Sequence, residues 1–165
     1  MQDLLFDSGS LEKDVVYTPD WCARDIVQHF QPNGRVLEPS KGGGAFLQYL
    51  PGADWCEIAE GRDFFRCFDR YDWIVGNPPY AGIPDWCRHS FALAGDGVYL
   101  IPCRSGYLGP QFIRDVYAWG GIVETRHYGG GGQLGFPFGN AVAAFHFRKG
   151  WQGDMKVTHY KQPNA

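Results

Sequence analysis

The chain has 165 residues, of which 44% are hydrophobic and 20% are charged, a balance that fits one folded domain and excludes a disordered chain. No apolar run approaches the roughly 20 residues that span a bilayer, and the first residues lack the pattern of a signal peptide, so we expect a cytoplasmic protein. The net charge of −3 argues only weakly against a surface covered in nucleic-acid-binding charge, and a local basic face is compatible with it.

The five cysteines are scattered along the chain and include no C-x-x-C pair. Neither a disulfide framework nor a zinc site is therefore predicted, and reduced thiols are expected. The five histidines also lack the spacing of metal ligands, so we expect no metal site.

In the first half of the chain, turn signals separate short apolar segments. Thr18-Pro19-Asp20 is typical of a helix start, and apolar residues at helical spacing predict a helix over residues 21–30. A buried strand is predicted at 35–38, followed by a glycine-rich turn and an apolar helix at 45–50. The pattern then predicts a second strand at 54–58.

The second half continues the alternation of strands and helices. A third strand is predicted at 71–75, a helix at 83–93, a strand at 97–101 and a helix at 111–119. Two final strands, at 122–128 and 141–148, flank a loop that contains residues 129–132. Strands that alternate with helices predict an α/β fold with a mostly parallel sheet and one antiparallel pair at its C-terminal end.

Ligands of such sheets bind beyond the carboxyl ends of the strands. The residues that follow predicted strands begin at Glu38, Glu57, Asn77 and Pro102, so we expect the site at this edge. Only five residues separate Glu57 from Asp63, too few for a crossover helix and another parallel strand. The sequence therefore predicts a shortened sheet edge.

Residues 37–46, Leu-Glu-Pro-Ser-Lys-Gly-Gly-Gly-Ala-Phe, form the first candidate ligand segment. Glycines let backbone approach a ligand closely, although a plain flexible turn explains them equally well. Glu38 disfavours a phosphate and favours an ammonium or hydroxyl ligand, and Glu57 is placed to accept both hydroxyls of a ribose. Asp63 is a candidate acceptor for an adenine amino group, and Phe64 is a candidate for packing on the adenine ring. Together they predict an adenosine pocket without a phosphate site, which S-adenosylmethionine fits.

Residues 74–80, Ile-Val-Gly-Asn-Pro-Pro-Tyr, form the strongest motif. An aromatic amine is a poor nucleophile because its lone pair is delocalised, and two acceptors aimed at its N–H bonds localise that pair. The Asn77 side-chain oxygen and the Pro78 carbonyl are candidate acceptors, and Pro79 restricts Pro78 to extended conformations. Tyr80 is a candidate for stacking on the base. Methyl transfer from a sulfonium then depends mainly on positioning, and a base in duplex DNA has to be flipped out.

Segments 38–46 and 77–80 together resemble the amino-methyltransferases, specifically the N6-adenine DNA methyltransferases of the gamma arrangement. Residues 17–19, Tyr-Thr-Pro, match the segment that begins this arrangement and closes over the methionine end of the cofactor. Residues 100–102 match the strand after the catalytic loop, and residues 138–149 match the final strands. The resemblance covers about residues 14–150, leaves 151–165 as a short tail, and implies a single Rossmann-like methyltransferase domain of bacterial or phage origin.

The resemblance also implies the functional residues. The implied cofactor contacts are Tyr17, Thr18, Pro19, Glu38, Pro39, Ser40, Gly42, Glu57, Asp63, Phe64 and Asn77. The implied catalytic residues are Asn77, Pro78, Pro79 and Tyr80. The candidate nucleic-acid contacts are Tyr80, Arg104, Arg126, Phe136 and Phe138, with His127, Arg148 and Lys149 as further candidates for phosphate. Core packing of the two phenylalanines and ordinary surface charge are the alternative explanations.

The family's usual target-recognition domain has no counterpart after residue 150, so sequence reading is left to loops 81–85, 104–110 and 129–140. We therefore expect relaxed or short specificity, or specificity supplied by a homodimer or a partner. Two other functions remain open. One is methylation of another acceptor, such as RNA adenine or a protein glutamine amide, and the other is a cofactor-binding module without turnover.

Overall fold

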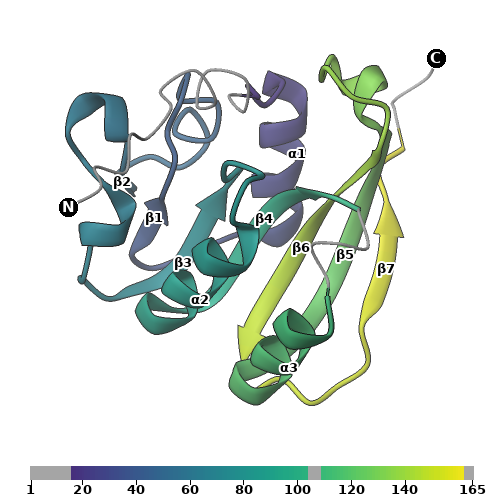
Figure 1. Ribbon diagram of the computed structural model, residues 1–165. Coiled ribbons are helices and arrows are strands. Elements are labelled where there is room, and N and C mark those ends of the chain that lie inside the picture. The colour runs from purple at the N-terminus through teal and green to yellow at the C-terminus, as the bar shows by residue number, and fades with distance from the viewer. Residues whose placement is uncertain (1–15, 104–108, 162–165) are drawn as a thin grey trace, which may run out of the picture.

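The computed structural model describes residues 16–103 and 109–161, which form one seven-stranded sheet with helices on both faces (Figure 1). The strands are β1 (Val36–Glu38), β2 (Asp54–Trp55), β3 (Tyr71–Gly76), β4 (Ala94–Pro102), β5 (Gly120–Gly130), β6 (Ala141–Lys149) and β7 (Lys156–His159). The α-helices are α1 (Asp20–Phe30), α2 (Ile83–Leu93) and α3 (Pro110–Trp119). The short 3-10 helices are η1 (Ile58–Glu60), η2 (Phe64–Arg66) and η3 (Gly131–Leu134).

The strand order is β2-β1-β3-β4-β6-β5-β7. Strands β2, β1, β3 and β4 are parallel, β6 runs antiparallel to both β4 and β5, and β7 is parallel to β5. The predicted mostly parallel sheet with a C-terminal antiparallel pair is thus confirmed. At the other end, the two-residue strand β2 forms the edge, as the short spacing between Glu57 and Asp63 predicts.

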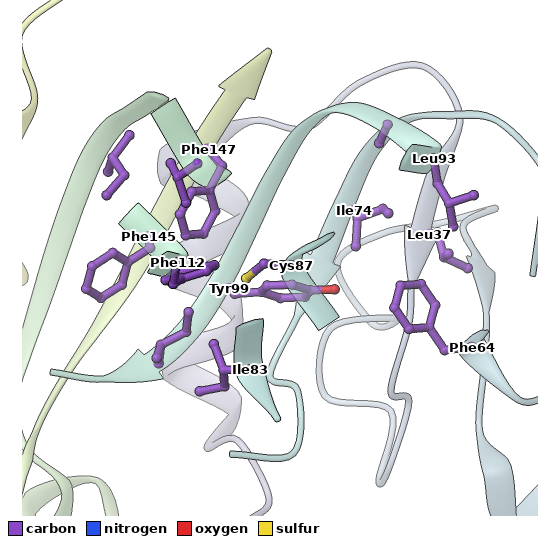
Figure 2. Close-up of a cluster of buried hydrophobic side chains, with 14 of the residues drawn as sticks. Leu37, Phe64, Ile74, Ile83, Cys87, Leu93, Tyr99, Phe112, Phe145 and Phe147 are labelled. Atoms are coloured by element: carbon purple, nitrogen blue, oxygen red, sulfur yellow. The ribbon is translucent and has the colours of Figure 1, made fainter. Parts of the chain in front are cut away.

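Two hydrophobic clusters, one on each face, hold the helices to the sheet. Because successive side chains of a strand point to opposite faces, Ile74 of β3 joins the cluster under α2 and α3, whereas Trp73 and Val75 join the cluster under α1. Figure 2 shows the first cluster, in which the Tyr99 side chain lies beside Cys87 and Phe112. The Tyr99 hydroxyl lies 2.6 Å from Ser90 Oγ, so its polar end is satisfied inside the core.

The predicted helix at residues 45–50 is wrong. This segment consists of turns, with hydrogen bonds from Tyr49 N to Phe46 O and from Leu50 N to Leu47 O. Six residues between a glycine turn and Pro51-Gly52 are too few to propagate an α-helix. Phe46 and Leu50 are nevertheless buried, so the apolar spacing that predicted a helix reflects contact with the core.

The predicted strand at residues 54–58 is too long. Strand β2 ends at Trp55, and Ile58 already belongs to η1. The Glu57 side chain accepts a hydrogen bond from Ala59 N and caps η1, which turns the backbone out of the sheet.

Strand β7 lies in the segment that the sequence analysis describes as a tail. Its residues Lys-Val-Thr-His are mostly exposed and carry no apolar alternation that predicts a strand. Hydrogen bonding to β5 and the contact of Thr158 Oγ1 with Glu124 Oε1, at 2.5 Å, hold it in place. None of the helices in the described ranges is long and apolar enough to cross a membrane.

Candidate active site

The carboxyl ends of β1, β2 and β3 meet, as the sequence predicts. Cys56 N donates to the Glu38 carbonyl and Lys41 N donates to the Cys56 carbonyl, both at 2.9 Å, so the segment after β1 is fixed to β2. Ser40 Oγ donates to the Asn77 carbonyl at 3.0 Å, which fixes the same segment to β3. A Cβ on Gly76 would lie 3.1 Å from Pro39 Cδ, so glycine permits the close approach of these segments.

The Asn77 side-chain amide has a defined orientation. Its Nδ2 donates to the Val16 carbonyl and to Thr18 Oγ1, at 3.1 Å each. Its Oδ1 is buried and has no hydrogen-bond partner within residues 16–103 and 109–161. A buried acceptor left unsatisfied costs about 1–3 kcal/mol. Because such atoms are rare in folded proteins, Oδ1 is a candidate acceptor for a ligand.

The other residues of the predicted catalytic motif extend away from the end of β3. Pro78 is buried and Pro79 is half-buried, and α2 begins shortly afterwards. The Tyr80 ring is buried and makes an edge-on contact with Phe138, with centroids 5.6 Å apart. In this conformation the predicted stacking of Tyr80 on a base would require the two rings to separate.

Glu38 is the most buried carboxylate of the site, with 1% of its surface exposed. Burial raises the pKa of this carboxyl to about 8, although a hydrogen bond from the Leu47 backbone and the charge of Lys41 act in the opposite direction. Its Oε2 has no hydrogen-bond partner in the part of the chain that the structure describes. The orphaned oxygen fits an ammonium or hydroxyl donor, as the sequence predicts for this position.

Tyr17 and Glu57 flank the glycine turn. A Cβ on Gly43 would lie 3.3 Å from the Tyr17 ring, which is exposed and lies over the turn. Gly42 has a positive φ of 49°, and its N–H donates to Glu57 Oε2 at 2.8 Å. Because each carboxylate oxygen can accept more than one hydrogen bond, Glu57 still has capacity for ribose hydroxyls.

Thr18 and Pro19 join this site to α1. The Pro19 carbonyl accepts from Cys22 N and Ala23 N at 3.0 and 3.1 Å, so it belongs to the first turn of the helix. The Thr18 hydroxyl contacts the Asn77 amide, which is a different partner from the cofactor that the resemblance implies.

The structure separates the two residues predicted to contact adenine. Asp63 caps η2 by accepting from Phe65 N at 2.9 Å, and it stays at the surface beside Arg66. Phe64 is only 2% exposed and stacks on Trp86 with centroids 4.8 Å apart, so its predicted contact with adenine is not available in this conformation. Ile58, which the sequence analysis missed, directly follows Glu57 and is 75% exposed. An apolar residue next to an acidic strand tip is the signal that could have identified it.

The two candidate aromatic residues of the last hairpin differ in position. Phe136 is buried in the cluster under α1, which supports the core-packing explanation. Phe138 is half-buried and contacts the Tyr80 ring, so it belongs to the neighbourhood of the catalytic motif.

The candidate phosphate contacts that the structure describes are not grouped around the site. Arg126 makes a two-point ion pair with Asp25, at 2.7 and 2.9 Å, which speaks against the predicted phosphate contact. Arg148 binds Asp96 near the start of β4, and Lys149 follows Arg148. Both residues therefore lie near the amino ends of β3 and β4, whereas Asn77 lies at the carboxyl end of β3. Arg104 lies outside the described residues.

His127 lies at the edge that carries Asn77, but several strands away. It lines a cavity of about 710 Å³ at the carboxyl ends of β5 and β7, together with Gln133, His159 and Tyr160. A polar ligand could therefore reach the His127 side chain through this cavity.

No protein-family model matches the chain. No curated protein matches it either. Among solved structures, a protein described as the modification subunit of a type I restriction enzyme from Vibrio vulnificus aligns over 98% of this chain and 49% of its own, with 13% identity and a TM-score of 0.65. A protein described as a class I S-adenosylmethionine-dependent methyltransferase from Listeria monocytogenes aligns over 95% and 71%, with 10% identity and a TM-score of 0.60.

This chain has the fold of the class I S-adenosylmethionine-dependent methyltransferases. A protein described as an RNA methyltransferase from Pyrococcus horikoshii shares it, with alignment over 77% of this chain and 81% of its own, 10% identity and a TM-score of 0.58. The chain spans about half the length of the Vibrio protein. The methyltransferase fold confirms the Rossmann-like prediction, and its known place for ligands is the strand edge that carries Glu38 and Asn77.

Proposed function

We propose that the chain transfers a methyl group from S-adenosylmethionine to the N6 amino group of adenine in DNA. The observation that carries this proposal is the Asn77 side chain, whose Nδ2 is held by two acceptors while its buried Oδ1 has no partner among the described residues. This oxygen is an acceptor at the end of β3, where an exocyclic amine would need one.

The residues at the ends of β1 and β2 fit the cofactor. The orphaned oxygen of Glu38 suits the ammonium of the methionine part, and Glu57 suits the ribose hydroxyls. Ile58 offers exposed apolar surface beside Glu57 for one face of the adenine ring, and Asp63 offers a carboxylate for its amino group. When bound, the cofactor supplies a methyl group that is already activated by a positively charged sulfur.

The protein contributes positioning. Asn77 Oδ1 and the Pro78 carbonyl accept the two N–H bonds of the target amine, which localises its lone pair and fixes its direction. Because the amine becomes far more acidic on alkylation, its proton needs no dedicated base. The absence of a nucleophilic Cys or a general-base His from the motif agrees with this chemistry.

DNA is the favoured acceptor because the chain resembles N6-adenine DNA methyltransferases in its motifs and shares its fold with a restriction-enzyme modification subunit. Residues 81 and 82 directly follow Tyr80, and Phe138 of the segment after β5 contacts the Tyr80 ring, so both segments would contact the duplex around a flipped base. For the 165-residue chain by itself we expect short or relaxed specificity, with a longer recognition sequence supplied by a second copy or a partner subunit.

Methylation of RNA adenine is the second candidate, because the Pyrococcus protein that shares the fold is described as an RNA methyltransferase. A competition assay distinguishes the two. The purified chain is incubated with labelled S-adenosylmethionine and a mixture that contains equal amounts of unmethylated duplex DNA, single-stranded DNA, RNA and total protein.

We expect label in DNA, and nucleoside digestion to recover it as N6-methyladenine. Label found only in RNA, or only in protein, would show that this molecule and not DNA is the methyl acceptor. N4-methylcytosine would keep the mechanism and change the base. Cofactor binding without label in any acceptor would favour a module without turnover.

A further inference from the structure

We propose that residues 16–18 are a positioning device for the catalytic amide: the Val16 carbonyl selects, and the Thr18 hydroxyl helps to hold, the orientation of Asn77 in which Oδ1 faces the substrate amine. This inference rests on the proposed function, because it assigns the amide to an amine acceptor. It gives Thr18 a role that differs from the cofactor contact implied by the sequence resemblance.

The selection follows from hydrogen-bond chemistry. A side-chain amide carries two hydrogens on nitrogen and none on oxygen, so its two ends are not interchangeable. Nδ2 donates to both the Val16 carbonyl and Thr18 Oγ1, at 3.1 Å each. Rotating the amide by half a turn would place Oδ1 against the Val16 carbonyl, which is an acceptor without any hydrogen to offer. The flipped state therefore loses the bond to Val16 and brings two acceptor oxygens together, whereas the Thr18 hydroxyl, which can donate as well as accept, can bond to either end of the amide.

The orientation has a direct consequence for catalysis. In the observed state, Oδ1 is the buried atom without a partner among the described residues. In the flipped state, an NH2 group would face the substrate amine, and two donors would oppose each other. The substrate amine can be held only when the Asn77 amide has the observed orientation. The fraction of protein in this state therefore limits the rate of methyl transfer.

The fold explains how two residues so distant in sequence reach Asn77. The Pro19 carbonyl accepts from the first amides of α1, and Cys22 and Ala23 of that helix are fully buried against the sheet. The helix start is therefore fixed relative to β3, and Thr18 is fixed with it. Figure 1 shows α1 lying behind the sheet with its first turn near the carboxyl ends of the strands.

The first test compares Thr18→Val with Thr18→Ser. Valine keeps the shape of threonine but removes the acceptor, whereas serine keeps the hydroxyl. We expect Thr18→Val to lower kcat about tenfold at saturating cofactor, the effect of one ordinary hydrogen bond. The Kd for S-adenosylmethionine should stay within about twofold of the wild type, and Thr18→Ser should restore most of kcat.

Thr158→Val is the matched control, because Thr158 also uses its hydroxyl in a hydrogen bond, to Glu124, but lies in β7. It should leave kcat unchanged. If Thr18→Val instead weakens cofactor binding and leaves kcat unchanged, Thr18 is a cofactor contact and the proposal is overturned.

The second test does not depend on any acceptor. The side-chain NH2 signals of Asn77 are identified in a ¹⁵N spectrum by their loss in Asn77→Ala. We expect both hydrogens to exchange slowly in the wild type and in Thr18→Ser, and one of them to shift and exchange faster in Thr18→Val.

Unchanged Asn77 signals in Thr18→Val would overturn the proposal. A wild-type chain that methylates no DNA would instead defeat the proposed function, while these signals would still report whether Thr18 orients the amide.

Discussion

Buried or half-buried carboxylates lie in both parts of the sheet, but their surroundings differ. In the β4–β7 part, burial acts to raise the pKa of Asp96, yet hydrogen bonds from His146 and Arg148 outweigh it and leave the pKa below its usual value. Glu124 follows the same pattern, with Thr158 and His29 as partners. In the β1–β3 part, Glu38 Oε2 has no such partner among the residues that the structure describes, and burial raises the pKa of Glu38 to about 8.

This comparison indicates what each part of the molecule does. Paired charges in the β4–β7 part fasten α1 and β7 to the sheet, so they serve the fold. Glu38 Oε2 and Asn77 Oδ1 are buried acceptors without a partner among the described residues, which lowers stability and leaves them able to accept from a ligand. The paired charges and the candidate binding site thus lie in different parts of one sheet.

The largest expected effect is on the paired side. Asp25→Ala would leave the Arg126 guanidinium and the Tyr128 hydroxyl without the carboxylate that both contact within 2.9 Å. We expect the free energy of unfolding to fall by about 3 kcal/mol, because a mostly buried charge loses its partner. Urea denaturation measures this change.

Asp85→Ala is the control for Asp25→Ala, since Asp85 pairs with Arg88 at the exposed surface. Its cost should be below about 1 kcal/mol. Equal costs for the two variants would break the distinction between the paired interior and the surface.

The next prediction concerns Glu38, whose substitution should raise the free energy of unfolding, whereas Asp25→Ala lowers it. Folded protein keeps a proton on Glu38 up to about pH 8, whereas the unfolded chain releases it near about pH 4.3. Because the folded state binds more protons in this window, wild-type stability falls as the pH rises through it. Glu38→Gln should remove this dependence, so that the variant is more stable than the wild type at pH 8.5.

Urea denaturation at pH 5.5, 7.0 and 8.5 tests the prediction, with cofactor affinity measured in parallel. The same variant should bind S-adenosylmethionine more weakly, because it loses the carboxylate for the ammonium. A variant that is less stable than the wild type at every pH, with unchanged cofactor affinity, would show that Glu38 serves the fold.

A smaller effect is expected at Ile58. Its exposed side chain stabilises nothing in the core, so Ile58→Ala should leave stability within about 0.5 kcal/mol of the wild type. Loss of apolar contact with the adenine ring should raise the cofactor Kd about fivefold, equivalent to about 1 kcal/mol. Isothermal titration measures the Kd.

Val157→Ala removes another exposed apolar side chain, on β7, and serves as the control. It should not change the Kd. An effect of Ile58→Ala no larger than that of Val157→Ala would exclude Ile58 from the cofactor pocket.

Most of the fold is predictable from local sequence signals. Helix α2 has the predicted limits, because Gly82 and Pro84 mark its start and its apolar residues repeat at helical spacing. Strand β3 is recognisable as an apolar run that ends at the Asn77 motif. Residues 45–50 mislead because burial against a core can produce helical spacing without a helix. Strand β7 is unpredictable because its contacts come from β5, and its own residues are polar.

The site was predictable as a set of residue types but not as a set of contacts. The positions of Glu38, Glu57 and Asn77 follow from their places after strands. That Phe64 packs on Trp86, leaving Ile58 exposed, depends on tertiary packing that spacing does not encode. The orientation of the Asn77 amide depends on residues 16–18, about sixty positions earlier in the chain.

The proposed methylation of adenine N6 is tested by the yield of N6-methyladenine from unmethylated DNA, measured by mass spectrometry for the wild type and Asn77→Ala. The control is Asn33→Ala, which alters an exposed asparagine in the turn after α1. We expect N6-methyladenine from the wild type and Asn33→Ala, and a rate about 100-fold lower from Asn77→Ala with cofactor binding retained, because the acceptor for the target amine is lost. A wild-type rate from Asn77→Ala would contradict the proposal.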